Sequence, residues 1–194
     1  MKTRILVLLI ALSINCFSQS IDYIDLMTKS ITAKQKLLED ILIDRGFISL
    51  DDSNYSKNPG YFAQNYQSIK SEPYQEDECT FLCAIDKFYF INPDKDILLI
   101  FKYNSAFFES KKGLEIRVTN SNKQSIFESI IRKLDSSNDY YREDSENGNI
   151  FAQFYSKEKK NGSSSSKYFI RFITPPLGNN NSKVYKIQMC EVFF

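Results

Sequence analysis

The sequence predicts an α+β domain: a mainly antiparallel sheet with two helices packed on one of its faces. Apolar residues recur at helical spacing between Ile21 and Gly46 and again between Ser121 and Leu134. Each of these segments is followed by short apolar runs of strand character. The two halves also resemble each other at a constant offset of about 89 residues. We therefore expect two tandem helix-plus-strands repeats, at about 21–119 and 120–194.

The internal similarity links residues 32–67 with residues 121–156. The identical pairs are Lys34 with Lys123, Gln35 with Gln124, Glu39 with Glu128, Ile41 with Ile130, Ser56 with Ser145, and Asn58 with Asn147. Both segments then contain the motif Phe-Ala-Gln-x-Tyr, at residues 62–66 and 151–155. This pairing keeps a helical stripe and a predicted strand in register, which indicates two copies of one structural unit.

The N-terminal segment has the features of a secretory signal peptide. Lys2 and Arg4 precede an apolar run from Ile5 to Ile14, and a small polar segment follows. The run is about ten residues, too short for a permanent membrane-spanning helix of roughly 20. We expect cleavage after Ser18 rather than lipidation of Cys16, and therefore a periplasmic or secreted protein with one domain over 19–194.

Charge and composition exclude some classes of function. Removing Lys2 and Arg4 lowers the basic residues from 25 to 23, against 24 acidic residues, a net charge of about −1. That balance does not favour a nucleic-acid partner. No second apolar span follows the signal segment, so we expect no transmembrane helix in the mature chain.

The mature chain keeps an odd number of cysteines, Cys79, Cys83 and Cys190. In an oxidising compartment at most one internal disulfide can form among them. Cys79 and Cys83 on one strand would lie roughly 13 Å apart, beyond the roughly 7 Å limit for a bridge. We expect a Cys83–Cys190 disulfide, because Phe81, Cys83 and Ile85 share a predicted core face; three reduced thiols are the alternative.

The first half contains a helical region and several predicted strands. The helical stripe is Ile24, Met27, Ile31, Leu38, Ile41 and Leu42; Gly46 ends it, as one long helix or as two. The predicted strands are 47–50, 61–67, 80–85, 88–91, 97–103 and 114–119. The run at 97–101 is typical of a central strand covered on both faces, whereas 114–119 alternates as a half-exposed strand does.

The second half begins with a helix that Ser121 and Gln124 would cap. Ile126, Phe127, Ile130, Ile131 and Leu134 form its apolar stripe, and each contributes about 1.5–3 kcal/mol if buried against a sheet. The predicted strands are 140–142, 150–156, 168–174 and 184–194. Residues 157–167, with Gly162 and consecutive serines, are expected to form a mobile hairpin loop.

The available chemistry argues against most enzyme classes. The chain has no histidine, which excludes Ser-His and Cys-His nucleophiles and the commonest zinc ligand. It has no phosphate-binding loop and no dinucleotide fingerprint. Ser164 and Lys167 match a Ser-x-x-Lys spacing only because they lie in a serine run. We therefore expect no enzyme, no cofactor and no metal site.

Carboxylate chemistry is the remaining enzymatic route, because a glycosidase needs only two suitably separated acids. Asp94 and Asp96 belong to a predicted turn, and Glu143, Asp144 and Glu146 lie in a Gly/Asn-rich segment. The second group lacks the alternating ligand order of a calcium loop. A solvated acidic loop explains it better.

The repeated Phe-Ala-Gln-x-Tyr motif carries the predicted binding site. On strands of period two, Phe62, Gln64 and Tyr66 share one face, as do Phe151, Gln153 and Tyr155, while the alanines face the helices. Rings beside amides on an open sheet face can stack on sugars or apolar peptide side chains. The structural alternative is that the rings belong to the core and the glutamines are bonded at a sheet edge.

Two functions follow from this interpretation. The first is a non-enzymatic binding module whose open sheet face takes a glycan, a peptide or an envelope protein. The second is a structural or assembly protein that forms a homodimer through the sheet face or edge. A carboxylate-dependent hydrolase is a third, weaker alternative.

Overall fold

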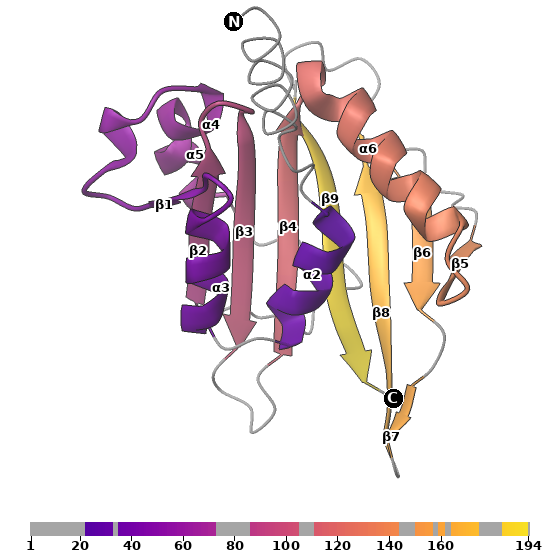
Figure 1. The fold of residues 1–194 in the computed structure, drawn as a ribbon. Helices are drawn as coiled ribbons and strands as arrows, with labels where there is room; N and C mark the ends of the chain where they lie inside the picture. The colour runs from indigo at the N-terminus through magenta and orange to yellow at the C-terminus, as the bar shows by residue number, and fades with distance from the viewer. Residues whose placement is uncertain are drawn as a thin grey trace, which may run out of the picture.

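One antiparallel sheet organises the chain (Figure 1). The computed structural model describes residues 22–32, 35–72, 86–104, 111–143, 150–156, 159–161, 164–174 and 184–193. The predicted signal peptide, Cys79, Cys83 and the predicted strand 80–85 lie outside these residues. The predicted α+β class with an antiparallel sheet is confirmed, although strands predominate over helices.

The sheet contains nine described strands, all paired antiparallel. They are β1 (Ile48–Leu50), β2 (Asp86–Asn92), β3 (Ile97–Asn104), β4 (Lys111–Thr119), β5 (Tyr140–Glu143), β6 (Ile150–Ser156), β7 (Lys159–Asn161), β8 (Ser164–Ile173) and β9 (Val184–Phe193). Their order across the sheet is β1-β2-β3-β4-β9-β8-β6-β5, and β7 pairs with β8. The C-terminal strand β9 therefore joins the two halves, because it pairs with β4 on one side and β8 on the other.

The described helices are α2 (Tyr23–Thr32), α3 (Gln35–Ile43), the 3-10 helix η1 (Tyr55–Lys57), α4 (Tyr61–Gln64), α5 (Tyr66–Lys70) and α6 (Asn120–Asp135). The N-terminal helical region is therefore two helices. Gly46 follows α3 with φ +80, a left-handed conformation that favours glycine. The predicted helix over 121–134 is confirmed as α6, which begins one residue earlier.

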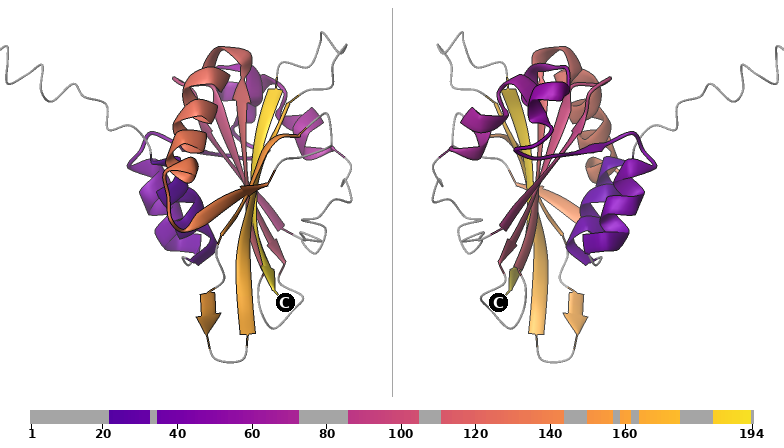
Figure 2. Two further views of the ribbon diagram at one scale, coloured as in Figure 1. Left: turned by 90° about the vertical axis from the view of Figure 1, so that its right-hand side faces the viewer. Right: turned by 90° about the vertical axis from the view of Figure 1, so that its left-hand side faces the viewer.

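The first face of the sheet packs against α2, α3 and α6, which lie on the same side in Figures 1 and 2. Its core consists of alternate residues of the strands, such as Leu114, Ile116 and Val118 of β4, which meet Met27 of α2 and other helical residues. We call this the first face below. Burying an apolar side chain in it contributes about 1.5–3 kcal/mol.

The second face carries the intervening residues of each strand. At one end it packs against α4 and α5, which lie on the opposite side of the sheet from α2 in Figure 2. Leu98 and Ile100 of β3 contact these short helices, while Leu99 of β3 faces the first core. The prediction that the apolar run at residues 97–101 belongs to a central strand covered on both faces is confirmed.

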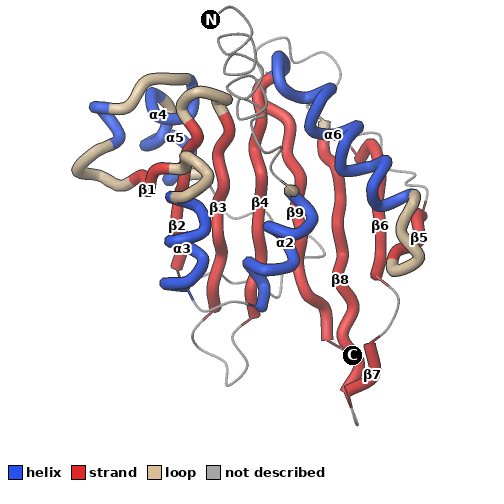
Figure 3. Tube along the Cα trace, in the orientation of Figure 1, coloured by secondary structure: helices blue, strands red, loops and turns tan. Residues whose placement is uncertain are grey.

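Three predictions are wrong in detail (Figure 3). Residues 61–67 form α4 and α5, not a strand. Glu115 and Arg117 of β4 are buried, so this strand is not half-exposed. The segment predicted as a hairpin loop contains the β7 pairing with β8 through Lys159–Ser166, Lys160–Ser165 and Asn161–Ser164.

The structure does not support the predicted tandem repeat where the two segments share the Phe-Ala-Gln-x-Tyr motif. The two copies of Phe-Ala-Gln-x-Tyr have different secondary structures, helical at residues 61–64 and extended at 150–156. Phe62 and Phe151 therefore do not occupy equivalent strand positions.

Candidate functional site

The first copy of the motif is part of the core and not of an open surface. Phe62 and Tyr66 are buried on α4 and α5, where the ring of Tyr66 lies 5.3 Å from Tyr89 in an edge-on contact. Gln64 is exposed on α4. The helices therefore separate the three residues that a strand would have placed together.

The residue at the variable position of the motif explains this difference. Asn65 stands there in the first copy, and its side chain donates to the carbonyl of Tyr61 at 2.7 Å, at the junction of α4 and α5. Phe154 stands there in the second copy and is fully buried in the first-face core. Phe62, Tyr66 and Ile69 recur at a helical spacing that the period-two interpretation missed.

The second copy lies on β6, as predicted. Ala152 is buried against the helical side, so Gln153 and Tyr155 belong to the second face. Phe151 lies at an irregularity in the β6–β8 pairing and is 58% exposed. Of the six predicted site residues, the structure thus brings only Gln153 and Tyr155 together on one face, with Phe151 beside them in the chain.

Cross-strand pairing extends these residues into two rows on the second face. The aromatic row joins Tyr141, Tyr155, Phe169 and Cys190 of β5, β6, β8 and β9. Its rings are in contact: Tyr141 stacks on Tyr155 at 5.6 Å between centroids, and Tyr155 lies 4.9 Å from Phe169. The polar row joins Glu143, Gln153, Arg171, Gln188 and Glu115 of β5, β6, β8, β9 and β4.

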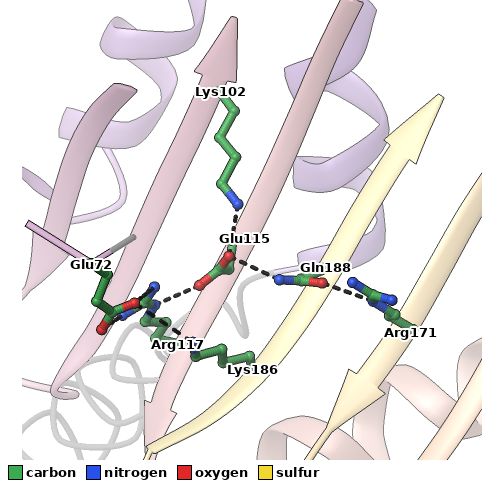
Figure 4. Close-up of polar contacts among 7 residues, drawn as sticks. All are labelled: Glu72, Lys102, Glu115, Arg117, Arg171, Lys186 and Gln188. Carbon is green, nitrogen blue, oxygen red and sulfur yellow. Dashed lines mark hydrogen bonds and ion pairs between the residues drawn. The ribbon is translucent and has the colours of Figure 1, made fainter. Parts of the chain in front are cut away.

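The polar row ends in a buried charge network (Figure 4). Glu115 accepts from the Nζ of Lys102 at 2.9 Å, from the Nε of Arg117 at 2.5 Å and from the Nε2 of Gln188 at 3.0 Å. Gln188 in turn accepts at its Oε1 from the Nε of Arg171 at 2.8 Å. Glu115 is 2% exposed, and such a carboxylate is stable only when its oxygens are paired.

Arg117 connects this network to the segment after α5. Its Nη1 and Nη2 donate to the two carboxylate oxygens of Glu72, each at 2.7 Å, in a bidentate pair. The Nζ of Lys186 lies 3.7 Å from the same carboxylate. The guanidinium therefore bridges two carboxylates that are far apart in the sequence.

The network keeps its acids ionised. Burial alone would raise the pKa of Glu115, but the charges of Lys102 and Arg117 outweigh it and hold that pKa well below the usual range. The pKa of Glu72 is also lowered, because the hydrogen bonds and charge of Arg117 outweigh the effect of burial. Neither carboxylate is therefore prepared to act as a general acid near neutral pH.

Sequence reasoning missed Glu115 and Arg117 because their alternation with apolar residues is equally typical of a solvent-facing strand. Their main partners lie far away, since Glu72 is 45 residues from Arg117 and Gln188 is 73 from Glu115. The one local signal was Arg117, a basic residue two positions after Glu115 and therefore on the same face of the strand.

Cys190 on β9 is disulfide-bonded and 1% exposed. The predicted partner, Cys83, lies outside the described residues. Within the described ranges, no helix combines the length and apolarity needed to cross a membrane. In the same part of the chain, no three metal-binding side chains are grouped to hold an ion.

Comparison with known proteins gives no relative. No family model matches the chain, and neither the curated proteins nor the solved structures contain a significant match.

Proposed function

We propose that this chain is a non-enzymatic binding module that holds a polysaccharide chain on the outer part of its second face, at β5 and β6. The observation that carries the proposal is the aromatic row, in which Tyr141 and Tyr155 stack at 5.6 Å with an interplanar angle of 19°. Tyr141 is 38% exposed, so one ring remains open to solvent while its partner supports it. Such rings stack on the apolar faces of sugars.

The polar groups beside this row favour a carbohydrate over an apolar peptide. Gln153 is half-buried and pairs across the strands with Glu143, which is exposed. An amide and a carboxylate next to a ring can bond the hydroxyls of a stacked sugar while the ring binds its apolar face. Phe151, two residues before Gln153, adds a second exposed ring at this edge.

The location of the site on paired strands supports the same proposal. Tyr155 is packed between Tyr141 and Phe169, so its position is fixed before any ligand arrives. A preformed platform lowers the entropic cost of binding.

We also propose that the protein acts outside the cytoplasm, in the periplasm or after secretion. The disulfide bond of Cys190 supports this location, because such bonds persist mainly in oxidising compartments. The signal-peptide character of residues 1–18 is the second argument.

Affinity electrophoresis in gels containing soluble polysaccharides, with sedimentation on insoluble cellulose, chitin and peptidoglycan, tests the polysaccharide proposal. We expect at least one polymer to retain the wild type, and Phe151→Ala and Gln153→Ala each to weaken retention about tenfold, or about 1.4 kcal/mol. Tyr61→Ala is the matched control, because Tyr61 is an aromatic residue 37% exposed on α4, away from this surface.

Two results would overturn the proposal. One is the absence of retention by every polymer, and the other is an equal loss in Tyr61→Ala and Phe151→Ala. If light scattering instead shows a dimer that Phe151→Ala converts to a monomer, the surface serves self-association.

A further inference from the structure

Lys87 and Lys102 lie directly opposite each other on β2 and β3. Both belong to the second face, because Lys102 follows Leu98 and Ile100 at even spacing and reaches Glu115. Cross-strand partners have their Cβ atoms about 4.5–5.5 Å apart, and like charges at such positions repel each other. The pair lies towards the opposite end of the face from Tyr155, since Lys102 on β3 is four strand spacings, or roughly 19 Å, from β6, and Lys87 is one strand further away.

Among the residues that the structure describes, the carboxylates near this pair are already engaged. Glu115 binds Lys102, Arg117 and Gln188, and Glu72 binds both terminal nitrogens of Arg117. The described cations here are Lys87, Lys102, Arg117 and Lys186, against Glu72 and Glu115. Positive charge is therefore in excess by two among these side chains.

Lys87 is the one of these four cations that pairs with neither Glu72 nor Glu115. Within the described part of the chain it makes no hydrogen bond and no ion pair, although its side chain is half-buried. Burial, followed by the charge of Lys102, lowers the pKa of Lys87 below its ordinary value. An anion placed between the two ammonium groups would remove this repulsion.

We infer that Lys87 and Lys102 form a binding site for an anionic oxygen group, a carboxylate or a phosphate, on the second face of the sheet. Lys102 keeps 23% of its side chain exposed, so the site is open to a ligand while its ammonium is positioned by Glu115. Two lysines provide several N–H donors and charge-assisted hydrogen bonds, the strongest kind for such groups. The inference does not depend on the polysaccharide proposal, since no residue of the aromatic row takes part.

Isothermal titration calorimetry with inorganic phosphate and with trigalacturonate, at ionic strength held constant with chloride, tests this inference. We expect saturable binding of at least one of these anions at a single site. Binding of phosphate alone would identify a phosphate ligand, and binding of trigalacturonate alone a carboxylate ligand; each supports the site if Lys87→Met weakens it, and binding that Lys87→Met leaves unchanged overturns the inference. Lys87→Met should weaken binding about tenfold, whereas Lys87→Arg, which keeps the charge, should largely retain it.

Lys57→Met is the matched control, because it removes one positive charge from an exposed position on η1. Phe151→Ala should leave anion binding unchanged, which separates this site from the proposed polysaccharide surface. The inference is overturned if neither anion binds saturably, or if Lys57→Met weakens binding as much as Lys87→Met. Circular dichroism melts without anion establish that Lys87→Met is folded, and Lys102→Met provides an independent second variant.

Discussion

Glu115 shows how a single buried charge can depend on residues from several strands. Its two oxygens receive donors from β3, β4 and β9, and nothing within its own strand except Arg117 supplies one. Removing the charge would leave the partly buried Lys102 without its counterion and the buried Arg117 with Glu72 as its remaining acidic partner. Breaking a buried pair in this way costs more than the intact pair contributes.

Glu115→Gln should therefore lower the free energy of unfolding by about 3–5 kcal/mol. Urea denaturation at pH 7 measures this loss. Glu128→Gln is the control, because Glu128 forms only an exposed pair with Arg132 on α6 and should change stability by about 0.5 kcal/mol or less. Equal effects of the two substitutions would contradict the structural role assigned to the network.

The low pKa of Glu115 predicts that the folded protein loses stability as the pH falls. The folded-state pKa of Glu115 lies below the ordinary value of 4.5, so its contribution is complete above pH 4.5. As the pH falls below 4.5, Glu115 becomes protonated in the unfolded chain but stays ionised in the folded protein. The free energy of unfolding therefore decreases until the pH reaches the lower pKa of Glu115 in the folded state. We expect wild type to lose more stability than Glu115→Gln between pH 6 and about pH 3, in urea titrations; parallel losses would contradict the prediction.

At the scale of elements, α4 depends on a turn from a distant hairpin. Gly60 precedes the helix with φ 98 and ψ 164, a conformation almost restricted to glycine. Asp96, at the end of the β2–β3 turn, accepts a hydrogen bond from the backbone N–H of Tyr61 at 3.1 Å. Asp96 itself has φ 47, which aspartate tolerates better than most residues.

Gly60→Ala should destabilise the fold by about 1–3 kcal/mol. A Cβ at this position would lie 3.1 Å from the Oδ1 of Asp96, so it strains the backbone and crowds the capping carboxylate. Thermal and urea unfolding measure the loss. Gln64→Ala, at an exposed position of the same helix, should remain within about 0.5 kcal/mol of wild type; a comparable loss there would show that α4 itself is marginal.

At the scale of the whole molecule, β9 joins the two halves and its cysteine adds a covalent link. Cys190 is disulfide-bonded within the second face, next to Phe169 in the aromatic row. We propose Cys83 as its partner. A link between these residues closes a loop of about 100 residues, which stabilises by up to about 4.7 kcal/mol in the chain-entropy model.

Peptide mapping without reduction, on protein exported to an oxidising compartment, should show a Cys83–Cys190 cross-link and one alkylatable thiol at Cys79. Cys83→Ser should lower stability by about 2–4 kcal/mol, and Cys79→Ser, the control, should leave it nearly unchanged. A Cys79–Cys190 cross-link would show that the proposed pairing is wrong. Three alkylatable thiols would show that the mature protein is not bridged in solution.

The sequence by itself determined the features that depend on local periodicity. The apolar stripe of α6, the strands at β2, β3, β6 and β9, and the left-handed Gly46 were all predicted, because each follows from neighbouring residues. The orientation of β6 also followed, since a small Ala152 suits the side on which helices pack. Gln153 and Tyr155 could therefore be assigned to the second face without coordinates.

Only the tertiary structure decided the rest. Two segments that share Phe-Ala-Gln-x-Tyr became a helix and a strand, because Asn65 bonds back to the chain while Phe154 fills the core. Glu115 became a buried ion because Lys102 of β3 and Gln188 of β9 join Arg117 of its own strand in donating to its carboxylate. Local pattern fixes which side chains share a face, but pairing across the sheet decides whether a charge on that face meets water or an opposite charge.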